Sequence, residues 1–515
     1  MTLSKHPISS IVIVGGGTAG WMTAAALSQH FHNMAVTIKL VESSQLGTVG
    51  VGEATIPTLR RFYAKLGFSD IEVIRATQAT CKLGIEFQDW HSPGSSFIHP
   101  FGLFGVPVKN TPFHHYWLKA RQLGQHAPLS DYSLGINLAR HNKFCFPQAK
   151  PESNLQVFDW ALHFDASLFA ELMRTYAVNQ QVEHIDGKIS EVHCHQSNGH
   201  ISALQLENGQ LIKGDLFIDC SGFQGLLINK TLKCGYLDWS EWLVCDRAFA
   251  VQTESSGEPV PRTIAKAHTA GWQWKIPLQH RTGNGHVYSS RYISDEQALQ
   301  TLVEHLPAKP LHAPRQFSFV PGRRTQAWTK NCIAVGLAAG FLEPLESTSI
   351  ALVETAIDKI ILSFPQAEYS QLEIDRFNSV TATEYERVRD FIILHYKTNQ
   401  RTDSAMWRDC RAMSVPSSLQ EKMQAFKSRG ELERKPWEIF GPDSWLAIYA
   451  GMDYLPQTYA AQVDNMPNDY LLHNLANMRD SIKTMVNAVP LHTEFLKRFC
   501  AYPSNAPASR PVADE

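Results

Sequence analysis

The sequence lacks an excess of charge of either sign. Its 47 lysine and arginine residues nearly balance 49 aspartate and glutamate residues, which leaves a formal net charge of −2. A protein that binds nucleic acid or an anionic membrane by charge needs a basic surface. We therefore expect neither nucleic acid nor a membrane as a partner.

Cysteine pairs and long uninterrupted apolar runs are also missing. The nine cysteines are scattered and form no Cys-x-x-Cys pair, which is typical of a reducing compartment and offers no metal motif. The apolar stretch from Ile11 to Leu27 contains four glycines, so it makes a poor membrane helix or signal peptide. We expect a cytoplasmic protein without a metal site.

The remaining composition is that of an ordinary globular protein. Apolar residues make up 44% of the 515 positions and charged residues 19%. A chain of this length is too long for one core and indicates two or three packed units. No internal repeat is evident.

Residues 9–42 carry a dinucleotide-binding pattern. A β-branched run up to Val14 predicts a buried strand, a helix is expected over residues 21–30, and a second strand over residues 36–41 ends at Glu42. Between them lie the glycines of a G-x-G-x-x-G loop and two small residues, namely Gly15, Gly17, Thr18, Ala19 and Gly20. Such a loop admits a pyrophosphate at a helix N-terminus, and the acid binds a ribose. The alternative is a glycine turn without ligand.

The later chain extends this pattern. Asn-Gly turns at residues 198–199 and 208–209 predict a β-meander. An apolar strand over residues 332–335 ends in a glycine-rich junction that contains Gly336 and Leu337, after which we expect a helix. The arrangement resembles the FAD-dependent aromatic hydroxylases, although these usually carry aspartate at position 337. The predicted fold is α/β, an FAD-binding Rossmann-like fold of the aromatic hydroxylase type.

Two further segments could carry chemistry. Residues 343–350 open a predicted helix that ends before Pro365, with Ser347 or Thr348 as N-cap. Free amides there suit a small anion. Lys82 begins an alternating run to Trp90, a predicted strand. A lysine at a strand edge is usually solvated, and nothing local distinguishes it.

Taken in order along the chain, these segments resemble the flavin-dependent tryptophan halogenases. The motif Trp-x-Trp-x-Ile-Pro at residues 272–277 separates that family from the hydroxylases. The similarity runs from about residue 9 to 407 and includes residues 15–21, 50–57 (Gly-Val-Gly-Glu-Ala-Thr-Ile-Pro), 344–348 and 391–396, Lys82, Arg401 and Asp403.

The resemblance implies a mechanism with residues in named roles. FADH2, O2 and chloride or bromide give hypohalous acid, which passes through a tunnel to the essential Lys82. Lys82 then acts as a haloamine or as a hydrogen-bond donor, with Glu346 and Ser347 as further catalytic residues. Halide is expected at Thr348 and Ser349, although the best-known members have glycine at 349. Trp272, Trp274, Ile276 and Pro277 form the barrier between flavin and substrate, unless the tryptophans are ordinary packing.

The resemblance also implies cofactor contacts, a substrate and partners. Further FAD contacts are expected at Ala54, Gly336, Leu337 and Ile350. His99 and Phe101 resemble an element that sandwiches an indole ring, and Trp445 lies where free-tryptophan enzymes have a tyrosine-rich clamp. Loss of that clamp favours an indole-like aromatic over free tryptophan. A separate NAD(P)H-dependent flavin reductase is expected, and a homodimer is left open.

Two other functions stay open at this point: an FAD-dependent aromatic monooxygenase that hydroxylates its substrate, and a non-catalytic flavin-binding protein. For the domains we predict a core over residues 1–365 with an interleaved β-rich substrate module (about 83–213 and 242–321). A mostly helical substrate-capping region over 366–499 and a disordered tail over 500–515 complete the prediction.

Overall fold

The computed structural model describes residues 8–45, 52–364 and 369–501. Of the tail predicted over 500–515, residues 502–515 lie outside them, as do the first two residues of the segment 50–57. The prediction is wrong at Cys500, which is buried in a short helical turn. Among the described residues, no helix has both the length and the apolar character needed to cross a bilayer.

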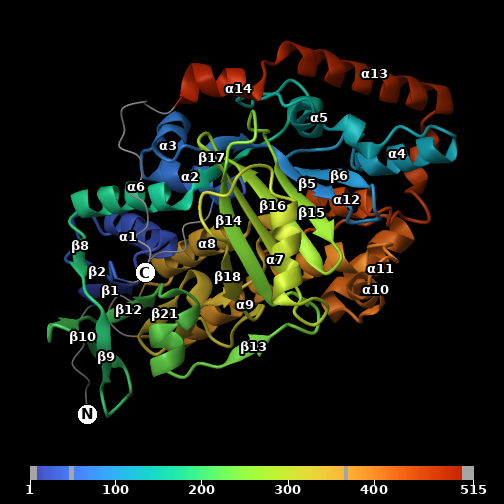
Figure 1. Cartoon of the computed structure of the whole chain (residues 1–515). Coiled ribbons are helices and arrows are strands. Elements are labelled where there is room, and N and C mark those ends of the chain that lie inside the picture. Colours follow the sequence, from blue (N-terminus) through green and yellow to red (C-terminus); the bar gives the residue numbers. More distant parts are fainter. Residues whose placement is uncertain (1–7, 46–51, 365–368, 502–515) are drawn as a thin grey trace.

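A six-stranded sheet forms the nucleotide-binding end (Figure 1). Its order is β20-β21-β12-β1-β2-β8, and all neighbours are parallel except β20 and β21. Apolar β-branched residues such as Ile11 and Ile13 are fully buried, which suits a sheet covered on both faces. The strands are β1 (Ser10–Val14), β2 (Thr37–Glu42), β8 (Glu183–Asp186), β12 (Leu216–Asp219), β20 (Trp328–Thr329) and β21 (Cys332–Ala334). The predicted Rossmann-like fold is confirmed.

A seven-stranded sheet lies beside it and is antiparallel except where β15 meets β5. It unites two segments that are distant in sequence, residues 84–100 and 247–318. Its order is β18 (Arg315–Ser318), β14 (Arg247–Glu254), β17 (Arg281–Tyr288), β16 (Gly271–Pro277), β15 (Thr263–His268), β5 (Gly84–Gln88) and β6 (Ser96–Pro100). The division into domains stays a prediction.

Three small sheets connect these parts. The predicted meander is confirmed as β9 (Ile189–Cys194), β10 (Ile201–Leu206) and β11 (Leu211–Lys213). A second sheet joins β13 (Tyr236–Asp238), β19 (Gly322–Arg324) and β22 (Gly340–Phe341). In the third, β7 (Ala161–Asp165) pairs with both β3 (Gly52–Ala54) and β4 (Thr80–Lys82). Lys82 therefore ends a short strand of its own, whereas the sequence placed it at the start of the next one.

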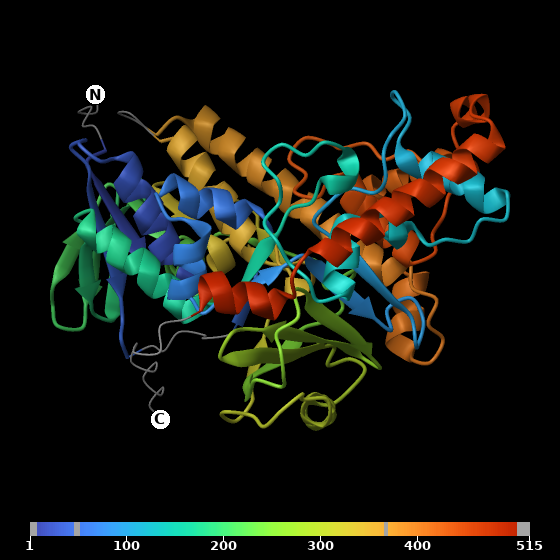
Figure 2. The ribbon, with the colours of Figure 1, turned by 90° about the horizontal axis from the view of Figure 1, so that it is seen from above.

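Helices cover both sheets and build the C-terminal region, whose α13 lies remote from the nucleotide sheet in both views (Figures 1 and 2). The α-helices are α1 (Thr18–His30), α2 (Thr58–Lys65), α3 (Asp70–Ala76), α4 (Phe113–Gln122), α5 (Leu134–Arg140), α6 (Ala166–Asn179), α7 (Asp295–Glu304), α8 (Ser349–Leu362), α9 (Gln371–Lys397), α10 (Ala405–Ala412), α11 (Ser417–Arg429), α12 (Pro442–Gly451), α13 (Asn468–Ala488) and α14 (His492–Phe495). Helix α9 contacts β20 of the nucleotide sheet and α12 of the C-terminal region, and so spans the two.

Short helical turns complete the chain: η1 (Leu129–Tyr132), η2 (Asn154–Gln156), η3 (Gly222–Gln224), η4 (Leu226–Thr231), η5 (Gly336–Ala338), η6 (Pro344–Glu346), η7 (Ala461–Asn465) and η8 (Leu496–Cys500). The helix expected after the junction at residue 340 is α8, which begins at Ser349. Between the two lie β22 and the short turn η6.

Candidate active site

The glycine loop after β1 has the shape of an anion cradle. Gly15 has a φ of +110°, and a Cβ added there would lie 2.4 Å from the carbonyl oxygen of Cys220. At Gly20 an added Cβ would lie 1.8 Å from the carbonyl oxygen of Gly15. Gly17 faces open space and caps α1 without a side-chain hydrogen bond. The first amides of α1, from Thr18, are thus accessible to a pyrophosphate, as FAD binding requires.

Glu42 ends β2 beside this loop. A Cβ on Gly16 would lie 1.5 Å from its Oε2, so the carboxylate is close to the backbone of the loop. Nε2 of His184, on β8, lies 2.8 Å from its Oε1. Burial raises the pKa of Glu42, and His184 opposes that rise. The acid has the position expected of a ribose ligand, and it has a protein partner as well.

The second glycine-rich junction meets the first. Gly336 has a φ of +66°, and an added Cβ would lie 3.0 Å from the Cβ of Ala19. Leu337 is half-buried beside it, and Ile350 is buried in the first turn of α8. Ala54 ends β3 and pairs with His163 of β7. Since β7 also pairs with β4, one strand links the cofactor side to Lys82. These residues fit FAD.

Lys82 is fully buried, contrary to the solvated position that its sequence context favours. Its Nζ donates to the carbonyl oxygen of Thr55 at 2.8 Å and to Oγ of Ser347 at 2.9 Å. It also lies 5.2 Å from the centre of the Phe101 ring. Burial lowers the pKa of Lys82 and the charge of Glu346 raises it, giving about 7. A neutral, nucleophilic amine is therefore accessible at neutral pH.

Ser347 reaches Lys82 from a strained backbone. Its φ is +59°, in the left-handed region that a residue with a Cβ rarely adopts. Such a conformation costs roughly 1–3 kcal/mol and is typical of functional sites. The turn η6 thereby brings Ser347 to an amine that is 265 positions away in the sequence.

Glu346 is fully buried between two histidines. Nδ1 of His99 lies 2.8 Å from its Oε2, and Nε2 of His395 lies 2.8 Å from its Oε1. Burial alone raises the pKa of a carboxyl group, but His99 and His395 outweigh it and bring the pKa of Glu346 to about 2. Glu346 is therefore a carboxylate at neutral pH.

Thr348 and Ser349 follow at the start of α8. Thr348 is the N-cap residue, as predicted, but its side chain makes no capping hydrogen bond. Its Oγ1 is buried and has no partner among the described residues. The first turn of α8 thus leaves a hydroxyl and amides available, which suits a small anion such as halide.

The tryptophan motif lies on β16. Trp272 is buried, and its Nε1 donates to Oε2 of Glu343 at 2.9 Å. The ring of Trp274 lies 6.1 Å from that of Trp272 and occupies the space that a side chain at Gly285 would need. Ile276 and Pro277 are buried at the end of the strand. The carbonyl of Pro277 accepts from Thr80 of β4 at 2.6 Å, which ties this wall to the strand of Lys82.

An aromatic wall adjoins Glu346. The ring of His99 lies 6.3 Å from Phe101, 5.7 Å from Phe391 and 6.0 Å from Phe440. Trp445, on α12, reaches the group through Phe391 at 5.0 Å. His99 also holds Glu346, a role that its proposed stacking on an indole did not include.

Sequence reasoning missed His395, Phe391, Phe440 and Glu343. The first two lie one helical turn apart on α9, inside a segment noted only for its resemblance. Glu343 lies three positions before Glu346 and is equally buried. The available signal for Glu343 was its place among apolar residues in the sequence, since an acid in such a segment can be buried. No comparable signal marks Phe440.

Comparison with known proteins agrees with this geometry. A model of the tryptophan halogenase family matches residues 10–468. The tryptophan 6-halogenase ThaL of Streptomyces albogriseolus is 32% identical, over 95% of this chain and 98% of the relative. The structure of BrvH, a flavin-dependent halogenase from Brevundimonas sp. BAL3, has 54% identity and a TM-score of 0.93, covering 96% of this chain and 99% of its own. Xcc4156, a flavin-dependent halogenase from Xanthomonas campestris, has 42% identity and a TM-score of 0.93, covering 97% and 100%.

Proposed function

The chain belongs to the tryptophan halogenase family, and from this premise we propose that Lys82 transfers halogen to an indole-like aromatic with the help of Glu346. The family, the fold and the predicted FAD-dependent halogenase activity are confirmed. One observation carries the proposal for the residues. One buried cluster brings together residues that are distant in sequence, namely Lys82, His99, Glu346, Ser347 and His395.

The cofactor chemistry is that of the family. When bound, FADH2 would supply two electrons to O2 and chloride or bromide two more, so that oxidised FAD, water and hypohalous acid are the products. In this chain the loop at Gly15–Gly20, Glu42, Ala54 and the junction at Gly336 would hold FAD, and Thr348 with Ser349 would hold halide. The wall of Trp272 and Trp274 would keep the cofactor apart from the substrate, so that the oxidant reaches the ring only at Lys82.

The buried cluster can carry out the transfer. Lys82, with its pKa near 7, can activate the oxidant as a hydrogen-bond donor when charged, or form a haloamine when neutral. Ser347 accepts a hydrogen bond from Nζ and orients it. The ring carbon gains the halogen and loses its proton, while the halogen leaves behind the amine of Lys82 on the haloamine route, or water on the hydrogen-bond route. The Glu346 carboxylate can stabilise the cationic ring and accept that proton.

The aromatic wall beside Glu346 favours a substrate without an amino-acid head group. By the resemblance, helix α12 corresponds to the segment that forms the clamp of the free-tryptophan enzymes, and it buries apolar and aromatic residues. The charges next to Trp445 already pair with each other, because Nζ of Lys422 lies 2.5 Å from Glu438 and 4.0 Å from the centre of the Trp445 ring. Indole or an indole-bearing compound suits this wall better than a zwitterion.

Family members need a separate flavin reductase. We propose an NAD(P)H-dependent reductase as the partner, with FADH2 diffusing between the two enzymes. The nine cysteines are free, which supports action in a reducing compartment such as the cytoplasm. A homodimer remains a prediction.

The test uses the purified enzyme with a flavin reductase, FAD, NADH and bromide. Indole and free tryptophan serve as competing substrates, and the isotope pattern of bromine identifies products. We expect brominated indole in excess. A Lys82→Ala variant should lose bromination while it still binds FAD and consumes O2. A hydroxylated product that forms without halide, or bromination that survives in Lys82→Ala, would contradict the proposal.

A further inference from the structure

His395 has one ring nitrogen whose proton is fixed by the backbone. It lies in the last turns of α9, where Nδ1 is 2.8 Å from the carbonyl oxygen of Phe391. A carbonyl oxygen can only accept a hydrogen bond. Nδ1 must therefore carry a hydrogen and donate it to Phe391.

The other ring nitrogen faces a carboxylate. Nε2 lies 2.8 Å from Oε1 of Glu346, and neither side chain is exposed to solvent. If His395 were neutral, its one hydrogen would be on Nδ1, and Nε2 would present a lone pair to another lone pair. Two acceptors at that distance repel each other, so a proton must lie between them.

The position of that proton follows from the second partner of Glu346. Oε2 is engaged by Nδ1 of His99 at 2.8 Å, so both carboxylate oxygens face imidazole nitrogens. This arrangement stabilises the charged form of Glu346, whose pKa is about 2 despite its burial. The proton accordingly belongs to His395, which is then an imidazolium.

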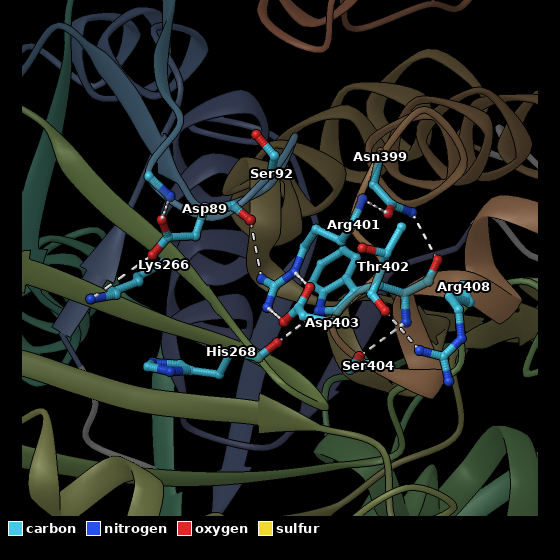
Figure 3. Close-up of polar contacts among 12 residues, drawn as sticks. Asp89, Ser92, Lys266, His268, Asn399, Arg401, Thr402, Asp403, Ser404 and Arg408 are labelled. Carbon is cyan, nitrogen blue, oxygen red and sulfur yellow. Dashed lines mark hydrogen bonds and ion pairs between the residues drawn. The ribbon is translucent and has the colours of Figure 1, made fainter.

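The end of α9 is fixed in place by a clasp of polar contacts (Figure 3). Nδ2 of Asn399 donates to the carbonyls of Tyr396 at 2.7 Å and Trp407 at 3.0 Å. Arg401 makes two hydrogen bonds to Asp403, at 2.9 and 2.6 Å, and donates to the carbonyl of Asp89 at 3.1 Å. The helix end that carries His395 is thus tied to the end of β5.

We propose that His395 is a positioning residue which, as a permanent imidazolium, keeps Glu346 ionised and oriented for halogenation at Lys82. The inference rests on the proposed role of Glu346. Other titratable groups that face this pair are Lys82 from β4, His99 from β6 and Glu343 from the same turn. They are unchanged in the variants below. Because the charge of Glu346 raises the pKa of Lys82, the state of His395 is first measured apart from turnover.

The chain supplies a matched control in His286. Its Nδ1 also contacts a helix carbonyl, that of Ala298, at 3.0 Å, while its Nε2 is buried and has no partner among the described residues. Burial lowers the pKa of His286 to about 4. Both histidines therefore contact a backbone carbonyl through Nδ1, but only His395 faces a carboxylate through Nε2.

The first measurement is independent of catalysis. Ring nitrogens of protein labelled with ¹⁵N at histidine are observed by NMR at pH 8, and signals are assigned by their loss in His395→Gln and His286→Gln. We expect both nitrogens of His395 to report the imidazolium and those of His286 the neutral ring. A neutral His395 would overturn the proposal.

The second measurement separates charge from shape. His395→Gln keeps an N–H donor toward Glu346 but loses the positive charge, so the pKa of Glu346 should rise. We expect bromination by His395→Gln to fall about tenfold at pH 6 and to recover toward pH 8. FAD binding by this variant should stay unchanged, and so should the pH dependence of bromination in the control His286→Gln. A wild-type pH profile in His395→Gln would overturn the proposal. Full activity in Glu346→Gln, with His395 still an imidazolium, would instead reject the proposed role of Glu346.

Discussion

Two carboxyl groups three residues apart, Glu343 and Glu346, are equally buried, and their pKa values are shifted in opposite directions. Oε2 of Glu343 accepts from Trp272 at 2.9 Å and from the hydroxyl of Tyr396 at 2.8 Å, and its Oε1 has no partner among the described residues. Burial raises the pKa of Glu343 to about 7, whereas that of Glu346 is about 2. Because both carboxyl groups are equally buried, their hydrogen-bond partners determine the difference between their pKa values.

Helix α9 supplies one partner to each acid. Tyr396 donates a neutral hydrogen bond to Glu343, and the adjacent His395, the proposed imidazolium, places its Nε2 2.8 Å from Oε1 of Glu346. A neutral donor stabilises a carboxylate less than a cation does and leaves the burial penalty in place. One turn of chain thereby holds an acid that is mostly protonated below about pH 7 beside the tryptophan wall and an anion beside Lys82. Such a divergence separates acid and base roles in active sites.

The largest expected difference is in bromination turnover, between the variants that replace each acid by glutamine. Glu346→Gln should lower bromination by roughly 10²–10³-fold, because it removes an electrostatic group placed where positive charge develops. Glu343→Gln resembles the neutral acid already present and should cost about threefold or less at pH 6. Turnover of the two variants under saturating FADH2 and bromide measures this. Equal losses of turnover in the two variants would contradict the difference in charge between Glu343 and Glu346.

The pH dependence of stability should separate the two acids next. Glu343 has a folded pKa above its ordinary value of 4.5, so the folded state holds this proton more tightly, and its contribution to stability falls as pH rises from about 4.5 to 7. Glu346 has a lowered pKa, so its contribution is present above pH 4.5 and is lost as pH falls toward 2.

Glu343→Gln removes the first of these dependences. The variant should gain up to about 3 kcal/mol on the wild type between pH 5 and pH 8, the linkage value of a shift of this size. Urea unfolding at both pH values gives the difference in free energy of unfolding. A constant difference would mean that Glu343 has an ordinary pKa.

These contrasts mark where sequence reasoning was sufficient. The glycine loop, β1, β2 and Glu42 are adjacent in sequence, and their spacing carries the geometry. The roles of Lys82 and Glu346 came from resemblance, because Lys82 is buried only through pairing with β7 and through the turn at Ser347.

The partners of Glu346 lie 247 and 49 positions away, at His99 and His395. No local pattern relates them, so neither the charge of Glu346 nor that of Glu343 could be derived before the structure. The turn η6, which carries Glu346 and has Glu343 as its N-cap, precedes the expected helix α8 and had no sequence signal of its own.

A smaller effect is expected from the donors to Glu343. Tyr396→Phe removes one hydrogen bond and should cost about 1 kcal/mol of stability, while it raises the pKa of Glu343 further. Bromination should change by no more than about twofold, since Glu346 keeps both of its partners. Thermal unfolding and turnover, measured on the same preparation, test this. A large loss of turnover would assign Glu343 a direct catalytic role.

At the halide candidate, an effect is expected on the bromide KM alone. Thr348→Val keeps the shape of the side chain and removes a hydroxyl that has no partner in the described part of the chain. The bromide KM should therefore rise a few-fold, about the value of one hydrogen bond. The rate at saturating bromide should be unchanged. A bromide KM equal to that of the wild type would remove Thr348 from the halide site.

The contrast between the two acids is tested most directly by infrared difference spectroscopy at pH 6. Subtracting the spectrum of Glu343→Gln from that of the wild type should reveal a protonated carboxylic acid C=O band, and subtracting that of Glu346→Gln should reveal carboxylate bands alone. A protonated C=O band that disappears in Glu346→Gln, or carboxylate bands that disappear in Glu343→Gln, would contradict the assignment of a neutral Glu343 and a charged Glu346.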